Sequence, residues 1–320
     1  MANQYLEQLN PVLAIGEGPQ GVNGIFPKYP QLFVHTIAVS NKSKVVLELE
    51  AHHPGTQLHA SLSARHSANN RLIDALHALK KKKEKVEFNP TTLSMLKVFG
   101  HYETGIKRFI LKHPGLFKFI LVGELRKIND LVPFFNNTHN ITQIENPGLR
   151  SKNTIPSLSR ASVDCRIQPH ILTGEYITRL VRGIDTKTVT IKESYTALNN
   201  QSSPVDHPFY SILVKTLEAL YPSAVIMPAQ MPFSTDCQFF RAKGIPVYSF
   251  MPIQVPVDIP RSAHASNEHF LLSSLSQGQK AYVHILTALM TAQDAIAQNG
   301  KTRRTPSKTK GQPYTLETRL

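Results

Sequence analysis

Two periods of hydrophobic residues divide the first two thirds of the chain into strands and helices. Residues 44–51 (KVVLELEA) alternate apolar and polar side chains over their second half, as a half-buried strand does. Residues 67–79 instead place Leu72, Ile73, Leu76 and Leu79 on one face of a helix. The same reasoning predicts further strands at 31–39, 160–167 and 187–191, and a helix at 174–183.

From about residue 204 the pattern changes to alternating helices and strands. We expect helices at 207–220, 236–243 and 270–297, and strands at 224–228 and 246–250. Near the N-terminus, residues 4–10 indicate a helix end, and a short apolar strand at 12–15 runs into a turn, Gly16-Glu17-Gly18. These segments supply fewer strands than a sheet of ordinary width contains.

Residues 92–135 differ from both regions, because Leu, Phe and Ile are interspersed there with Lys and Arg. This mixture predicts amphipathic helices, and Pro114 predicts a break among them.

Composition fits a folded protein, since 41% of the 320 residues are hydrophobic and 18% are charged. Two cysteines imply no disulfide framework, so a reducing compartment is expected. The first residues lack the basic and apolar regions of a signal peptide, and no apolar run is long enough to span a bilayer. We therefore expect a cytoplasmic protein.

The net charge of +14 is concentrated in Lys80 to Lys83 and in the tail, residues 298–320. Such runs bind nucleic acid or anionic lipid in some proteins. The alternative is a solvated helix end followed by a disordered tail. No zinc finger, helix-turn-helix or aromatic-interleaved basic sheet accompanies the charge, so nucleic acid is not an expected partner.

Two loops carry candidate chemistry. In residues 260–268, His264 stands near Glu268, which suits a metal ligand with a neighbouring carboxylate. In residues 54–61, His59 lies between a strand and a helix, where the segment could equally be a turn and a helix cap. Either loop alone is a weak signal.

The order of several short motifs is more specific. They are GEGPQGVNGIFP, a strand preceded by Lys42, HHPGTQLHAS, Lys152 to Pro156 (KNTIP), Val163 to Ile167 (VDCRI), Ser234-Thr235-Asp236 and HASNE. This series resembles the zinc-dependent exopeptidases and amidohydrolases that include carboxypeptidase S, the N-fatty-acyl-amino-acid hydrolases and the aminoacylases. The resemblance covers about residues 4–295, and the helical stretch at 92–140 resembles an insertion of the carboxypeptidase S branch.

The resemblance implies roles for five residues. His264 matches a zinc ligand, and His59 matches a lid histidine that stabilises the developing oxyanion, often from a partner subunit. Asn153 and Arg166 match lid residues that hold the substrate. Lys42 matches a lysine at the start of the first long lid strand and is expected to bind the substrate with them. Arg166 could equally pair with Glu17 or another carboxylate.

Other positions depart from the family pattern. The family's His-x-Asp and Glu-Glu motifs, which supply most ligands of the zinc pair and the general base, occur nowhere in this sequence. Gly16 stands where the family's Asp-Glu-Gly turn offers a zinc ligand, and Glu17, as the next residue on a strand, faces away. Gln238 and Ser249 replace arginines of close relatives. Thr235 and Asp236 could simply cap the following helix.

The resemblance therefore implies an α/β fold: a partial catalytic domain with a mixed sheet and helices, interrupted by an α+β lid or dimerisation domain with a four-stranded sheet. The expected divisions are a catalytic remnant at 1–38, the lid at 39–195 with its insertion near 92–140, more catalytic domain at 196–297, and the tail at 298–320.

Three functional interpretations stay open. The first is the C-terminal portion of a truncated or split zinc metallopeptidase or amidohydrolase, whose substrate is a small peptide or an N-acyl amino acid. This portion would be inactive alone and would need a separately encoded N-terminal half, with its zinc site incomplete or absent. The second is a non-catalytic ligand-binding module or a homodimer formed through the lid. The third is a basic accessory protein acting through Lys80 to Lys83 and the tail.

Overall fold

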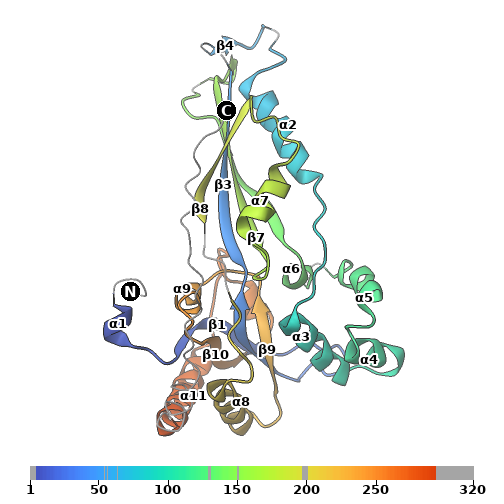
Figure 1. Ribbon diagram of the computed structural model, residues 1–320, viewed down its shortest axis with the longest axis vertical. Helices are drawn as coiled ribbons and strands as arrows, with labels where there is room; N and C mark the ends of the chain where they lie inside the picture. Colours follow the sequence, from blue (N-terminus) through green and yellow to red (C-terminus); the bar gives the residue numbers. More distant parts are fainter. Residues whose placement is uncertain are drawn as a thin grey trace.

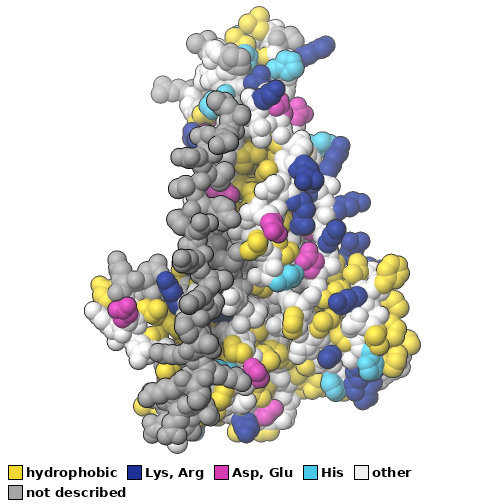
Figure 2. All heavy atoms as spheres, viewed as in Figure 1, with side chains coloured by type: hydrophobic (Ala, Val, Ile, Leu, Met, Phe, Trp, Pro, Cys, Tyr) yellow, Lys and Arg dark blue, Asp and Glu magenta, His cyan; other side chains and the backbone are white. Residues whose placement is uncertain are grey.

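Two sheets lie at opposite ends of an elongated molecule (Figure 1). The computed structural model describes residues 5–53, 55, 57–62, 64–128, 131–149, 151–196 and 201–292. The predicted tail at 298–320 lies outside this range. None of the described helices is long and apolar enough to cross a membrane. Lys and Arg side chains are prominent along the flank formed by α2 (Ala68–Lys80) and the helices within residues 90–135 (Figure 2).

The lower sheet is mixed and has four strands in the order β1-β10-β2-β9. They are β1 (Ala14–Val22), β10 (Val247–Val255), β2 (Val34–Asn41) and β9 (Val225–Met231). β1 is parallel to β10, β2 is parallel to β9, and the two pairs meet antiparallel. The expectation of a narrow α/β sheet is confirmed.

Helices cover both faces of this sheet because its strands are apolar on both sides. On one face, α8 (Pro208–Leu220) and α11 (Leu272–Thr291) bury Leu213 and Ile285 against Ile37 and Phe250. On the other, α3 (Pro90–His101) packs Met95 against the β9 side. Shorter helices, α1 (Leu6–Leu9), α9 (Cys237–Arg241) and α10 (Asp258–Arg261), complete this part of the chain.

The helical insertion begins with α3. Asn89 and Thr92 cap the N-terminus of this helix with reciprocal hydrogen bonds, and Pro90 lies in its first turn. It continues through α4 (Gly105–Lys112), α5 (Lys118–Leu125) and α6 (Val132–Phe135). Pro114 lies between α4 and α5, so the predicted break is confirmed.

The upper sheet is antiparallel, in the order β5-β7-β3-β8, which agrees with the expected four strands. The strands are β5 (Thr138–Glu145), β7 (Leu158–Ile167), β3 (Ser43–His52) and β8 (Val189–Thr196). Side chains of β3 and β7 alternate in burial along their whole length. The buried face is covered by α2 (Ala68–Lys80) and α7 (Thr173–Val181), which pack Leu76 and Tyr176 against Leu47 and Val163. We call this part the antiparallel module.

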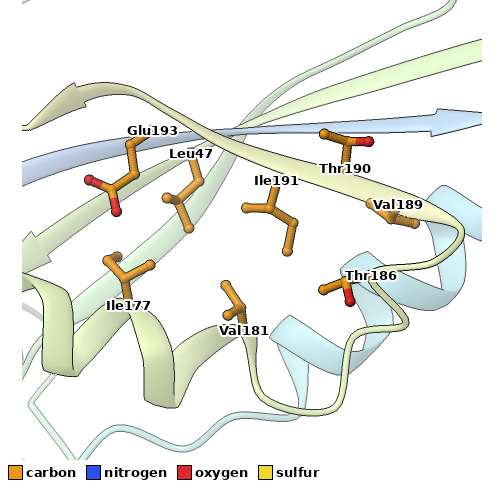
Figure 3. A pocket seen from close by; sticks show the side chains of 8 residues that line it. All are labelled: Leu47, Ile177, Val181, Thr186, Val189, Thr190, Ile191 and Glu193. Carbon is orange, nitrogen blue, oxygen red and sulfur yellow. The ribbon is translucent and has the colours of Figure 1, made fainter. Parts of the chain in front are cut away.

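A cavity in the antiparallel module lies between α7 and β8 (Figure 3). Its lining is mostly apolar, with Ile177 and Val181 from the helix facing Ile191 from the strand, and Glu193 at one end. None of the five predicted site residues lines it.

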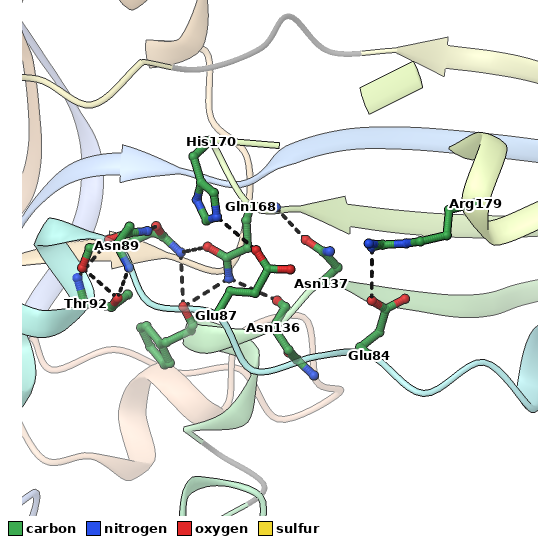
Figure 4. A network of polar contacts seen from close by, with 11 residues as sticks. Glu84, Glu87, Asn89, Thr92, Asn136, Asn137, Gln168, His170 and Arg179 are labelled. Atoms are coloured by element: carbon green, nitrogen blue, oxygen red, sulfur yellow. Dashed lines mark hydrogen bonds and ion pairs between the residues drawn. The ribbon is translucent and has the colours of Figure 1, made fainter. Parts of the chain in front are cut away.

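The two sheets are joined rigidly, because β2 ends at Asn41 and β3 begins at Ser43 with Lys42 alone between them. A buried amide network crosses the same junction (Figure 4). The side-chain amide of Gln230 on β9 donates to Gln168 Oε1 (2.5 Å) and to Phe134 O (3.0 Å). The backbone N–H of Gln168 in turn donates to Asn137 Oδ1 (2.8 Å).

One expectation for the N-terminal strand was wrong. Gly16 to Gly18 do not form a turn but lie inside β1, which continues to Val22. A Cβ atom at Gly18 would lie 2.2 Å from the backbone carbon of Ser249 on β10. The glycines therefore permit close approach of two parallel strands rather than a change of chain direction.

Candidate active site

His59 and Asn153 meet at the tip of the antiparallel module. A short ladder of β4 (Leu58–His59) and β6 (Thr154–Ile155) pairs His59 with Thr154. The backbone N–H of Ser61 donates to His59 Nδ1 (3.2 Å), and His59 Nε2 lies 3.4 Å from the Asn153 side-chain nitrogen. Both side chains are exposed, so this pair is accessible from outside the chain. Pro54 and Thr56 of the preceding motif lie outside the described residues.

Arg166 lies toward the opposite end of β7, close to the junction between the sheets. Eight residues separate it from Leu158 along the strand, which at about 3.3 Å per residue gives roughly 26 Å. Its guanidinium donates two hydrogen bonds to the Asp164 carboxylate, at 2.6 and 3.0 Å. Lys44 Nζ lies 3.7 Å from the same carboxylate. Of the two interpretations of Arg166, the structure thus shows pairing with a carboxylate, and the partner is Asp164 rather than Glu17.

Lys42 is completely buried at this junction. Its Nζ atom has no hydrogen-bond partner among the described residues. Burial lowers the pKa of this amine to about 7, and the nearby positive charge of Arg166 contributes to that decrease, while Glu84 partly opposes it. Lys42 is therefore an amine held near the midpoint of its titration at neutral pH, in an interior position.

Gly16 faces a buried thiol and hydroxyl instead of an open cleft. A Cβ atom at Gly16 would lie 2.0 Å from Cys237 Sγ and 3.2 Å from Ser249 Oγ. The two side chains contact each other at 3.0 Å. Glu17 is exposed, as expected for the next residue on a strand. The space in which an aspartate at position 16 would place its carboxylate is thus filled by Cys237.

His264 lies in an exposed turn after α10, with a left-handed backbone (φ 63°). Its backbone N–H donates to Glu268 Oε2 (3.1 Å), so the neighbouring carboxylate holds the turn together. Asn267 is also exposed. Asp236 is the N-cap residue of α9, as one of the two interpretations expected, but its side chain makes no capping hydrogen bond.

The residues present do not fit a pair of zinc ions. Zinc requires several His, Cys, Asp or Glu ligands converging on one point. Among the described residues, no group of three such side chains is close enough to hold a metal ion. Gly16 offers no ligand, and Cys237 occupies the place of its missing side chain. Of the predicted site residues, the structure brings His59 and Asn153 together. It places Arg166 and Lys42 elsewhere, near the junction between the two four-stranded sheets.

Comparison with known proteins decides the family. The family model described as peptidase family M20/M25/M40 matches residues 13–288, which is most of the chain. The chain belongs to this family. It is 22% identical over 265 residues to the human protein named N-fatty-acyl-amino acid synthase/hydrolase PM20D1, covering 82% of this chain and 52% of that protein.

Solved structures of peptidases share the fold. The di-peptidase Dug1p of Saccharomyces cerevisiae superposes with a TM-score of 0.61 at 14% identity, over 90% of this chain and 60% of that one. The M20 family metallo-carboxypeptidase Sso-CP2 of Sulfolobus solfataricus gives 0.57 at 18% identity, over 89% and 64%. The chain thus spans about half the length of its curated M20 relative and less than two thirds of these structures.

Sequence reasoning missed Cys237 and Ser249 as a contacting pair. Cys237 is one of two cysteines, and it follows Ser234-Thr235-Asp236 directly, but nothing in the local pattern places it opposite Gly16. The available signal for this contact was Gly16 in place of an expected aspartate. The volume of a side chain that is absent from a packed interior is normally filled by a neighbouring side chain, here that of Cys237.

Proposed function

We propose that this chain supplies the lid and the C-terminal part of the catalytic domain of an M20 amidohydrolase, and that it does not hydrolyse substrate alone. The substrate class is a small peptide or an N-acyl amino acid, cleaved at an amide bond next to a free carboxylate. The names of two similar proteins support this class, since one is named for N-fatty-acyl amino acids and the other is a di-peptidase.

The observation that carries the inactivity is the arrangement around Gly16. At the family position of an aspartate zinc ligand there is no side chain, and Cys237 Sγ lies only 2.0 Å from the place where a Cβ atom at position 16 would be. The sequence contains neither the His-x-Asp nor the Glu-Glu motif expected for the remaining ligands and the general base. Those groups would have to come from another polypeptide segment.

The exposed pair at the tip supports a role in substrate handling by a homodimer. His59 and Asn153 lie at the end of the antiparallel module farthest from the mixed sheet (Figure 1). A histidine there can reach the reacting carbonyl of a second copy more readily than that of its own chain. Its Nε2–H would then donate a hydrogen bond to the developing oxyanion. This hydrogen bond becomes stronger as negative charge builds up on the oxygen, so it stabilises the transition state more than the bound substrate.

The cytoplasm is the proposed compartment, because both cysteines are free thiols. A binding or dimerisation module without catalysis is the second candidate. It is favoured by the antiparallel module, whose core is continuous and formed by its own strands and helices. The basic accessory protein is disfavoured, because the lysine run ends a helix and Lys82 donates to the carbonyl of Arg182 (2.6 Å).

Metal content and activity of the purified chain test the proposal. We expect less than one tightly held zinc per chain and no hydrolysis of N-acyl amino acids or dipeptides. Co-expression with a polypeptide carrying His-x-Asp and Glu-Glu should restore both zinc and turnover, and His59→Ala should abolish that turnover. A zinc pair in the isolated chain, with turnover lost in His264→Ala, would contradict the proposal. Dimerisation and ligand binding without any restored turnover would favour the second candidate.

A further inference from the structure

Helices α4 and α5 project a group of exposed apolar side chains that the proposed hydrolysis does not use. We call residues 105–128 the insertion tip. The exposed fractions are 92% for Phe119, 81% for Leu116 and 71% for Ile106, and Phe109 and Ile120 are about half exposed. Side chains of this size are seldom left in water together in a soluble protein, so the group marks an interaction surface.

The exposure follows from how the insertion packs. Leu121 and Leu125 on the inner face of α5 are buried against Leu96 of α3 and Phe135 of α6. This core takes up the inner face of α5, and Phe119 lies on the opposite face of that helix. Phe109 also packs against the ring of Phe117, with centroids 5.6 Å apart. Ile106 and Phe119 are thus presented from helices that pack on the rest of the chain, and Leu116 lies in the turn between these helices.

Positive charge surrounds these apolar side chains. The insertion tip carries six Lys or Arg residues and a single acidic one. The acidic residue, Glu124, is already paired with Lys127 at 2.7 Å. Figure 2 shows yellow apolar and dark blue basic side chains next to one another on this projecting part of the molecule. The basic residues are Lys107, Arg108, Lys112, Lys118, Arg126 and Lys127.

This combination suits a lipid surface better than a protein partner. Lysine is depleted in the core of protein interfaces, because its ammonium is costly to dehydrate and its stem to immobilise. At a membrane the stem lies along the acyl region while the ammonium stays with the phosphates. Short amphipathic helices with Phe and Leu on one face and Lys or Arg beside them bind in this way.

We propose that the insertion tip docks peripherally on a phospholipid surface that carries anionic headgroups. Phe119, Leu116 and Ile106 enter the boundary between headgroups and acyl chains, and the surrounding lysines contact phosphate and carboxylate groups. Docking of this kind requires no membrane-spanning helix. It is independent of the proposed hydrolysis and would bring the chain to a surface where long-chain amphiphiles collect.

The absence of tryptophan from the chain allows a direct test of insertion. Phe119→Trp would place the single tryptophan fluorophore at the insertion tip, and Leu275→Trp on the exposed face of α11 is the matched control. With vesicles of phosphatidylcholine and phosphatidylserine, we expect emission from position 119 to shift to shorter wavelength and to be quenched by brominated acyl chains. Emission from position 275 should not change, and pure phosphatidylcholine should have little effect on either.

Co-sedimentation with the same vesicles tests whether the apolar residues of the insertion tip contribute to vesicle binding. Phe109→Ser with Phe119→Ser should lower vesicle binding about tenfold or more, since two exposed aromatic side chains that lipid would cover are lost. Leu275→Ser with Leu286→Ser, on α11, is the matched apolar control and should bind as the parent does. Circular dichroism of each variant confirms that the fold is kept.

Reversing the charge of lysines tests whether the basic residues of the insertion tip contribute to vesicle binding. Lys107→Glu with Lys118→Glu should weaken binding and reduce its salt dependence, whereas Lys81→Glu with Lys83→Glu at the end of α2 should not. The proposal is overturned if the Phe119→Trp chain binds vesicles while its tryptophan emission stays unchanged, or if neither pair of variants at the insertion tip weakens binding. It is also overturned if the emission from position 119 responds to a second polypeptide or to self-association and not to lipid.

Discussion

Replacing Lys42 by methionine should change how stability depends on pH. The side chain is completely buried, its Nζ has no hydrogen-bond partner among the described residues, and its pKa is about 7 rather than 10.5. Methionine has a similar length and no charge, so Lys42→Met keeps the packing and removes the titrating group.

The direction in which the free energy of unfolding changes with pH follows from how many protons the folded and unfolded states bind. The unfolded chain protonates Lys42 below about pH 10.5, but the folded chain does so only below about pH 7. Between these values the unfolded state binds more protons, so the free energy of unfolding rises with pH. Below pH 7 both states are protonated and the contribution is constant. A depression of this size corresponds to a gain of about 2 kcal/mol between pH 7 and pH 9.

Urea unfolding followed by far-ultraviolet circular dichroism at several pH values measures this gain. We expect the free energy of unfolding of the parent to rise relative to that of Lys42→Met over this range, and the variant to be the more stable at pH 7. Lys44→Met, at a partly exposed lysine two residues later on β3, controls for the loss of a lysine. Parallel pH profiles for the parent and Lys42→Met would refute the reasoning, because they would mean that the buried amine is solvated or paired.

Three further changes test the mixed sheet. His35 is buried and stacked on Tyr221, and burial lowers its pKa to about 4. The free energy of unfolding of the parent should therefore fall by about 2 kcal/mol between pH 7 and pH 4.5, because the unfolded state binds the proton first, and that of His35→Phe should not fall in this way. Gly16→Asp should destabilise by about 2 kcal/mol or more, and Cys237→Ala in the same chain should recover part of that loss, measured by a double-mutant cycle. Arg241→Lys should lower the free energy of unfolding by about 2–4 kcal/mol in urea titrations, since the buried guanidinium donates to three separate segments.

Local patterns predicted most elements correctly, because strand and helix periods are read from adjacent residues. The alternation of residues 44–51 corresponds to β3, and the helical spacing of Leu72, Leu76 and Leu79 corresponds to α2. The break at Pro114 separates α4 from α5. Gly16 to Gly18 were mistaken for a turn, since a glycine pair also marks strands that approach closely, and the neighbouring strand β10 is more than 200 residues away.

The sequence by itself determined the family, the narrow α/β sheet and the loss of the expected metal-binding motifs, since each is carried by residue identity and order. The family resemblance also implied a second sheet of four strands, and the structure shows that this sheet is antiparallel. Only the tertiary structure decided where the candidate residues lie. His59 meets Asn153, which follows it by 94 residues in the chain, because β4 pairs with β6, whereas Arg166 is held by Asp164 in the separate four-stranded sheet. Burial of Lys42 and the filling of the Gly16 space by Cys237 likewise depend on contacts between distant segments, which no local pattern encodes.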